Sequence, residues 1–251
     1  MKPIRFNNGF NSQFNYHNNF DSFFEGECNQ LARHCAYTVA TKIREAVFNP
    51  FIICGEVGTG KTHLTQAIFA KIAFDFPYMN ALYITGEELW TKYVNAIRNK
   101  NPQKFFVRIH KVDVLIIDDL QLLFEKSMTM DALTLIVDHF IARKKQIIFT
   151  SSIQPAMGLD INTRLYSRLC AGLTVNLHPP SKKVRREALK SALVKTELIL
   201  SDTIVEYISE VKFSSIRELQ GILFALISNA SMLKTPIDMK LVDVLLKDKI
   251  K

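Results

Sequence analysis

The sequence predicts an α/β fold in which a parallel five-stranded sheet lies between helices and is followed by a small all-helical domain. Two observations lead to this prediction. Five short apolar runs alternate with longer stretches of helical periodicity, and such alternation is typical of a parallel sheet. After the pair Pro179-Pro180 we expect no further strand, because the remaining residues fit three or four amphipathic helices.

Five short runs are expected to be strands, and the run from Val112 to Ile117 is of the kind that is buried on both faces of a sheet. The five runs are FIIC (51–54), ALYIT (81–85), VDVLII (112–117), QIIFTS (146–151) and LTVNL (173–177). Around them, periodicity predicts helices over 29–46, 63–74, 87–98 and 130–143.

Three segments follow from this pattern. Residues 1–19 are rich in Asn and Phe and lack periodicity, so we expect a loose arm there. Residues 20–178 would form the α/β domain, and residues 181–251 would form the helical lid domain, with the two prolines at the boundary.

Composition narrows the class of protein. The chain has 251 residues, 48% of them hydrophobic, a formal net charge of +8 and a pI of about 9.3. This charge is compatible with a nucleic-acid partner, but no tail or block concentrates it. The four cysteines form no Cys-x-x-Cys pair, which favours reduced thiols over disulfides or zinc. No apolar segment is long enough for a signal-peptide core or a membrane span, so we expect a cytoplasmic protein.

The segment GEVGTGKT (55–62) follows the first expected strand and precedes a helix, as a phosphate-binding loop requires. Its glycines let backbone N–H groups converge on phosphate oxygens, and the helix adds its positive dipole end. We expect Lys61 to reach the β- and γ-phosphates and Thr62 to bind Mg²⁺ through its hydroxyl. The alternative is a Gly-rich turn beside a surface lysine.

Two adjacent acids, Asp118 and Asp119, close the apolar run that begins at Val112. Beside a phosphate loop, Asp118 would hold Mg²⁺ directly or through water, and Asp119 would orient or deprotonate the water that attacks the γ-phosphate. Successive side chains of a strand point to opposite faces, so neighbouring acids can serve two partners. The alternative is a helix N-terminus that merely carries acids.

These motifs resemble those of the AAA+ ATPases, and within them the ATPase core of the DnaA family of bacterial replication initiators. The resemblance runs from Phe20 to about Pro236 and includes NPFIICGEVGTGKTHL, VDVLIIDDLQLL and IRELQG (216–221). It implies ATP or ADP with Mg²⁺ as cofactors. The nucleotide-binding residues would be Gly55, Gly58, Thr59, Gly60, Lys61, Thr62, His63 and Asp118, with Thr62 and Asp118 at the metal.

The resemblance also implies roles for three arginines. Arg217 would be the sensor 2 arginine, which reaches from the lid to the phosphates of its own subunit's nucleotide. Arg168, in TRLYSRL (163–169), would be an arginine finger that enters the site of a neighbouring subunit, and Arg164 would be a second inter-subunit arginine. The alternatives are a local surface ion pair of Arg217 with Glu218 and two solvated arginines.

In this family an insertion after the second strand contacts single-stranded DNA. Here it would be residues 87–106, where Val94 matches a contact position, as does Lys126 after the acidic pair. A basic and aromatic mixture suits such contacts, but the same spacing also fits a helix that buries its apolar face. Met128 stands where the family has an arginine, which removes one phosphate contact.

Ser152 occupies the sensor 1 position, which is usually an Asp in the family. A neutral hydroxyl is a weaker acceptor, so the resemblance leaves open how fast ATP is hydrolysed to ADP and phosphate. The implied function is ATP-dependent, head-to-tail assembly on origin DNA in the initiation of replication or in its control. Alternatives are a regulator like Hda or a helicase loader that acts on a clamp, an initiator or a helicase, a small-molecule kinase, and an assembly module in which ATP is structural. An excised core and a short paralogue both fit the chain.

Overall fold

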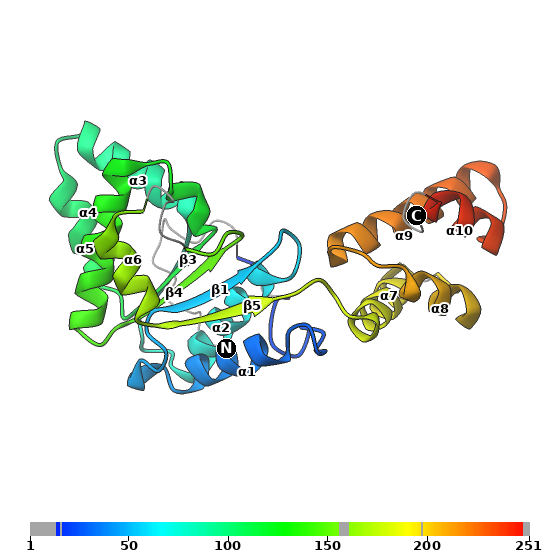
Figure 1. The fold of residues 1–251 in the computed structure, drawn as a ribbon, viewed down its shortest axis with the longest axis horizontal. Helices are drawn as coiled ribbons and strands as arrows, with labels where there is room; N and C mark the ends of the chain where they lie inside the picture. The colour runs from blue at the N-terminus through cyan, green and yellow to red at the C-terminus, as the bar shows by residue number, and fades with distance from the viewer. Residues whose placement is uncertain (1–13, 16, 156–160, 197, 248–251) are drawn as a thin grey trace. The chain divides into compact units, whose positions relative to one another are not determined.

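In the computed structural model, residues 14–15, 17–155, 161–196 and 198–247 are described. They group into two compact units (Figure 1). The first takes Leu31–Gly55 and Lys61–Leu177 with the described residues before Phe24. The second takes Phe24–Gln30, Glu56–Gly60 and the described residues from His178 onward. Most of the predicted arm, residues 1–19, lies outside the described residues.

A parallel five-stranded sheet forms the centre of the first unit, which confirms the predicted fold class. The strand order is β2-β3-β4-β1-β5. Because every pairing is parallel, the carboxyl ends of all strands lie at one edge of the sheet. The strands are β1 (Phe51–Gly55), β2 (Ala81–Thr85), β3 (Val114–Asp118), β4 (Gln146–Ser151) and β5 (Leu173–Leu177).

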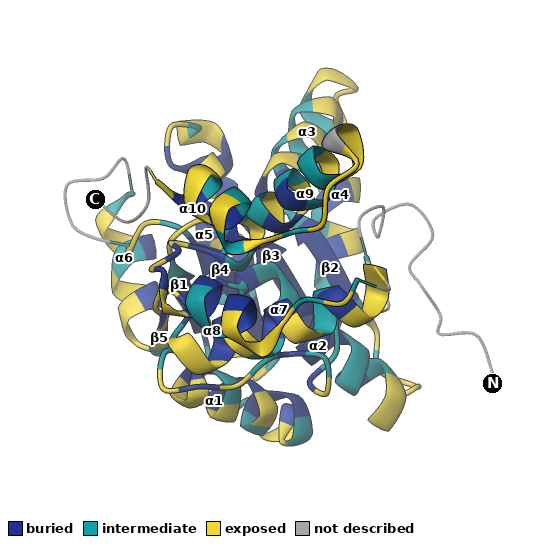
Figure 2. Cartoon of the chain, turned by 90° about the vertical axis from the view of Figure 1, so that its right-hand side faces the viewer, coloured by how far each residue is buried: buried dark blue, intermediate teal, exposed yellow. Residues whose placement is uncertain are grey.

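Helices cover both faces of the sheet (Figure 2), so β3 and β4 are buried throughout and β1 is buried up to Cys54. Side chains of β1 alternate: Phe51 and Ile53 pack with the helices of one face, and Ile52 and Cys54 with those of the other. The first face carries α1 (Gln30–Thr41) and α2 (Lys61–Asp75). The second carries α3 (Gly86–Arg98), α4 (Pro102–His110), α5 (Ser127–Ala142) and α6 (Thr163–Cys170).

Local signals set the starts of several helices on the second face. At α3, the hydroxyl of Thr85 accepts from the N–H of Glu88, whose carboxylate accepts from the N–H of Thr85 in return. At α4, Asn101 caps the helix and Pro102 occupies the first turn. The sequence interpretation ended its helix at Arg98, as α3 does, but assigned no helix over 102–110, although this Asn-Pro pair was available as a signal.

Three predicted boundaries were wrong by a few residues. The third strand begins at Val114 because Val112 still belongs to the turn after α4, where its N–H donates to the carbonyl of Ile109. The helix predicted over 29–46 ends at Thr41 and continues as a short 3-10 helix, η1 (Ile43–Glu45). The helix expected to begin at residue 130 begins at Ser127.

Four helices follow Pro180 in the described part of the second unit, and no strand does, as predicted. They pack around a core of their own that includes Leu189, Ile208, Leu226 and Val242. None of the described helices in the chain is both long and apolar enough to cross a membrane. The four are α7 (Lys182–Thr196), α8 (Asp202–Glu210), α9 (Ile216–Leu233) and α10 (Met239–Leu246).

Candidate functional site

The Gly-rich loop that joins β1 to α2 is a tight turn. Gly58 and Gly60 have φ angles of +82° and +105°, in the left-handed region that residues with a Cβ rarely adopt. The N–H and the hydroxyl of Thr59 both donate to the carbonyl of Glu56, at 3.4 and 2.9 Å. Such a backbone lets successive N–H groups converge on an anion.

Lys61, the first residue of α2, is 6% exposed. Its Nζ donates to the carbonyl of Gly55 at 2.7 Å, which brings the ammonium to the carboxyl end of β1. Burial raises the pKa of the neighbouring Cys54 thiol to about 11, and the charge of Lys61 opposes that rise. An ammonium at the end of β1, where the predicted phosphate-binding loop begins, suits an anionic ligand.

Asp118 is 2% exposed and is held from both neighbouring strands. The phenol of Tyr83 on β2 donates to its Oδ2 at 2.5 Å, and the hydroxyl of Thr150 on β4 donates to its Oδ1. Burial and the charge of Asp118 raise the pKa of Tyr83, so the phenol remains a donor. Sequence reasoning missed Tyr83 and Thr150 because strand periodicity does not reveal which side chains meet across strands.

Asp119 does not lie on the strand, which corrects the sequence interpretation of two successive strand residues. It has a left-handed backbone with φ +58°, and η2 (Leu120–Leu123) follows it. Its N–H donates to Oγ1 of Thr150 at 2.8 Å, and its Oδ1 accepts from Nε2 of Gln121 at 3.0 Å. Gln121 in turn accepts the N–H of Ser152 at 3.0 Å. The second acid is thus linked to the sensor 1 position through one glutamine.

His63 lies one residue beyond the phosphate loop motif and contacts the segment before α1. Its Nε2 lies 3.1 Å from both the hydroxyl of Ser22 and the carbonyl of Asn19, and its ring meets Phe23 edge to face. Burial lowers the pKa of His63, and the hydrogen bond to Asn19 opposes that shift. In these contacts the ring fastens the N-terminal segment to α2, and its predicted role at the nucleotide stays a prediction.

The three predicted arginines are on surfaces. Arg164 and Arg168 project from α6 and share the carboxylate of Asp138 on α5, with nitrogen–oxygen distances of 2.6 and 2.8 Å. Arg217 is exposed in the first turn of α9. The neighbouring Glu218 accepts the N–H and the hydroxyl of Ser214 at 2.8 and 2.9 Å.

The two candidate DNA residues lie near one indole ring. Nζ of Lys126 lies 5.2 Å from the ring centroid of Trp90, a cation–π contact. Val94 is one helical turn after Trp90 on α3 and is partly buried. Trp90 also packs against the core of that face, as expected for a helix that buries its apolar side, and the DNA contact stays a prediction.

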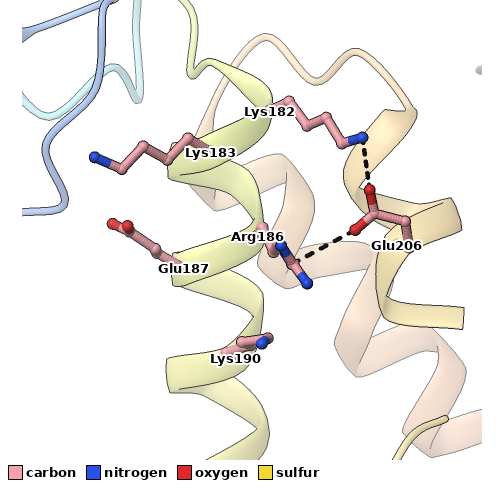
Figure 3. A pocket seen from close by; sticks show the side chains of 6 residues that line it. All are labelled: Lys182, Lys183, Arg186, Glu187, Lys190 and Glu206. Atoms are coloured by element: carbon pink, nitrogen blue, oxygen red, sulfur yellow. Dashed lines mark ion pairs between the residues drawn. The ribbon is translucent and has the colours of Figure 1, made fainter. Parts of the chain in front are cut away.

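A shallow depression of about 390 Å³ lies between α7 and α8, lined by Lys182, Lys183, Arg186, Glu187, Lys190 and Glu206 (Figure 3). Glu206 pairs with Lys182 at 2.6 Å and with Arg186 at 3.5 Å, and these pairs are the dashed lines of Figure 3. The depression shares no residue with the predicted site. Its lining has four cationic and two anionic side chains, and its ion pairs are of the kind found on an ordinary solvated helix face.

The oxygen donors near the loop fit Mg²⁺ better than a transition metal. No cluster of three or more His, Cys, Asp or Glu side chains able to hold a metal occurs in the described part of the chain. Mg²⁺ prefers a few protein oxygens supplemented by water and phosphate. The hydroxyl of Thr62 and the carboxylate of Asp118 have this character.

Comparison with known proteins agrees with the fold and the motifs. The family model of the bacterial DnaA ATPase domain matches residues 14–176. The chain belongs to this family. Its sequence is 36% identical to the chromosomal replication initiator protein DnaA of Flavobacterium psychrophilum over 92% of this chain and 48% of that protein. The chain thus spans about half the length of the DnaA relatives that it matches.

Two solved DnaA structures have the same fold. Domain III of the Thermotoga maritima initiator superposes with a TM-score of 0.84 at 29% identity, covering 96% of this chain and all of that domain. A DnaA bound to AMPPCP and single-stranded DNA superposes with a TM-score of 0.77 at 26% identity, over 88% of this chain and 69% of that one. The DnaA resemblance seen in the motifs is therefore confirmed.

Proposed function

We propose that the chain binds ATP with Mg²⁺ and hydrolyses it to ADP and phosphate. The loop over Gly55–Thr62 would hold the phosphates, with Lys61 on the β- and γ-phosphates. Thr62 and Asp118 would hold Mg²⁺, which supplies charge neutralisation at the phosphates when bound. Asp119 would orient the attacking water, and Arg217 would contact the phosphates from the lid.

One observation carries this proposal. Lys61 and Asp118, 57 positions apart in the sequence, are both buried at the carboxyl edge of the same parallel sheet. Ligands of open α/β sheets bind at this edge. A buried lysine and a buried aspartate at this edge, with the Gly-rich motif directly before the lysine in the sequence, support the binding of a triphosphate and its metal. The nucleotide analogue bound to a DnaA of the same fold supports this assignment.

Calorimetric titration with Mg-ATP tests the proposal. Lys61→Ala should abolish measurable binding, because the phosphates lose their main cation. Lys71→Ala is a matched control on the same helix, since this lysine pairs with Asp75 on the surface. If Lys61→Ala binds Mg-ATP as well as the parent while the control is normal, the proposed role of this loop in phosphate binding is wrong.

We further propose that ATP-bound copies assemble head to tail in the initiation of DNA replication. Arg168 would enter the neighbour's nucleotide site, where an arginine finger is typically worth about 10³ to 10⁵ in rate. The family membership and the exposed position of Arg168 support this proposal. Sedimentation of the purified chain with ATP and with ADP tests it: assembly is expected in ATP only, and Arg168→Ala should remove it.

Single-stranded DNA is the proposed partner of the surface around Val94 and Lys126. The cation–π pair of Lys126 and Trp90 supports this, because it combines a positive charge with a partly buried aromatic ring. Lys126→Ala should weaken binding and lower the salt slope by about 0.7 per lost phosphate contact. If DNA does not bind, the chain acts through protein contacts instead, as a regulator or helicase loader of this fold would.

A further inference from the structure

A single carboxylate on α5 is shared by both arginines of α6. Oδ1 of Asp138 accepts a hydrogen bond from Nε of Arg168 at 2.8 Å, and its Oδ2 lies 2.6 Å from Nη2 of Arg164. The side chain of Asp138 is 19% exposed, against 65% for Arg164 and 47% for Arg168. The acid is therefore the inner member of the group, and the arginines form its outer part.

The acid binds its two arginines in different ways. Arg164 approaches with a terminal nitrogen, so the outer end of its guanidinium faces the carboxylate. Arg168 approaches with Nε, which is the nitrogen nearest its own backbone. A guanidinium is planar with five N–H donors in a fixed fork, so a bond at Nε orients the plane and leaves the terminal amino groups to other acceptors. Among the described residues, no hydrogen bond takes up a terminal nitrogen of Arg168.

The helix that carries the arginines is itself fixed on α5. Leu165 and Leu169, each next to one of the arginines in the sequence, are buried in the core of this face. Asn162 caps α6 and also donates to Asp131 and Thr134 of α5, at 3.3 and 3.2 Å. Asp138 is thus not needed to attach α6, and its bonds to the arginines affect mainly where those side chains point.

We propose that Asp138 is a positioning residue that presents the terminal amino groups of Arg168 to a phosphate bound by a second copy of this chain. This inference rests on the proposed ATP-dependent assembly and names the residue that prepares Arg168 for it. Without the carboxylate, two cations one helical turn apart repel each other, and Arg168 loses its fixed direction. Orientation of this kind is what a pre-organised site supplies to a phosphate.

The test isolates one interface by mixing two variants of the full chain. The acceptor carries Arg168→Ala, so it binds ATP but donates no finger. The donor carries Lys61→Ala, so it offers Arg168 but has no nucleotide of its own. Fluorescence anisotropy of a labelled acceptor measures the dissociation constant of this pair in ATP and in ADP. Asp138→Ala is then placed in the donor or, separately, in the acceptor.

In the donor, Asp138→Ala should weaken pairing in ATP by at least about tenfold. Donor Asp138→Asn, which keeps an oxygen for Nε of Arg168, should restore pairing to within about threefold of the parent. Asp131→Ala is the matched control, because it lies two turns earlier on α5 and touches neither arginine. In the acceptor, Asp138→Ala should leave pairing unchanged, since its finger position is already empty.

Four results would overturn the inference. Unchanged pairing of the Asp138→Ala donor would mean that the acid does not orient Arg168 for the neighbour. Tighter pairing would mean that the acid holds Arg168 back from it. Equal weakening by the donor and acceptor substitutions would mean a general effect on the fold. If the parent pair fails to form in ATP, the proposed assembly is wrong and the inference falls with it. If the parent pair forms but does not depend on Asp138 of the donor, only the inference is wrong.

Discussion

Tyr83 donates its phenolic hydrogen to Oδ2 of Asp118 across the parallel pair of β2 and β3. The hydroxyl of Thr150 on β4 donates to the other oxygen of the same carboxylate. A buried acid with a donor on each side has its orientation fixed before any ligand arrives, and the remaining lone pairs stay available for Mg²⁺ or its water. The sheet thus positions this acid through its two neighbouring strands.

Replacing Tyr83 by Phe should destabilise the protein by about 1–3 kcal/mol, because a buried carboxylate oxygen loses its donor. Urea denaturation measures the change. Tyr78→Phe is the matched control, since that side chain is 95% exposed and removal of its hydroxyl should be neutral. Equal stability of Tyr83→Phe and the parent would show that water replaces the phenol at this position.

Asp119→Asn should retain ATP binding and lower hydrolysis by about 10²- to 10⁴-fold, the usual share of a general base. Asn tolerates the left-handed backbone of this position, so the turn and the N–H bond to Thr150 are expected to survive. Single-turnover assays after a binding measurement separate the two effects. Unchanged turnover would assign the water-orienting role elsewhere, with Gln121, which donates to Oδ1 of Asp119, as the next candidate.

How much of this could be predicted depends on the kind of information that each feature carries. The expected bounds of QIIFTS match β4, because an apolar run between turns leaves little choice for a strand buried on both faces. The left-handed turn at Asp119 was not predicted, since periodicity describes regular backbone only. The ion pairs of Asp138 were not predicted for another reason, because its partners lie 26 and 30 positions away in the sequence. A single sequence does not pair such residues.

The phosphate loop was predictable because its spacing is a local chemical requirement. Gly58 and Gly60 adopt the positive φ values that made glycine necessary, and Lys61 begins a helix as expected. The role of His63 at the nucleotide, which the family resemblance implied, stays a prediction. Its contacts with Asn19 and Ser22, which pack the N-terminal segment against α2, were not predicted from the sequence.

A stacked pair of imidazoles should make stability depend on pH. The rings of His110 on α4 and His139 on α5 lie 3.7 Å apart with planes 8° from parallel. Burial lowers the pKa of both, and the charges of Lys145 and Arg143 lower them further, as does His139 for His110. Below a pH of about 6.5 the two imidazoles are protonated in the unfolded chain, whereas in the folded chain they bind protons only at lower pH.

The free energy of unfolding should consequently fall as the pH drops below about 6.5, by up to about 1.4 kcal/mol per pH unit for each proton involved. Urea titrations between pH 5 and 8 measure this slope. His139→Gln should flatten it, because one resisting imidazole is gone and the other loses its neighbour. His34→Gln removes an exposed imidazole on α1 and should leave the slope unchanged. An equal slope in His139→Gln would assign the acid sensitivity to other groups, such as the partly buried His63.

Substitutions at two glycines are expected to have opposite effects on the free energy of unfolding. A Cβ at Gly172 would lie 1.8 Å from the carbonyl oxygen of Pro50, which is backbone and cannot turn aside. The same oxygen accepts the N–H of Leu173 at 3.0 Å, where β5 begins to pair with β1. Gly172→Ala should therefore push the edge strand outward and cost about 1–3 kcal/mol, as overpacking does.

Gly221, in the interior of α9, has nothing within 4 Å of the corresponding Cβ. Gly221→Ala should stabilise the helix by about 0.5–1 kcal/mol, because alanine has the higher helix propensity. Thermal unfolding of both variants beside the parent measures the two shifts. A gain of stability in Gly172→Ala would mean that Pro50 does not approach as closely as described. A loss in Gly221→Ala would mean that this face of α9 is covered in solution.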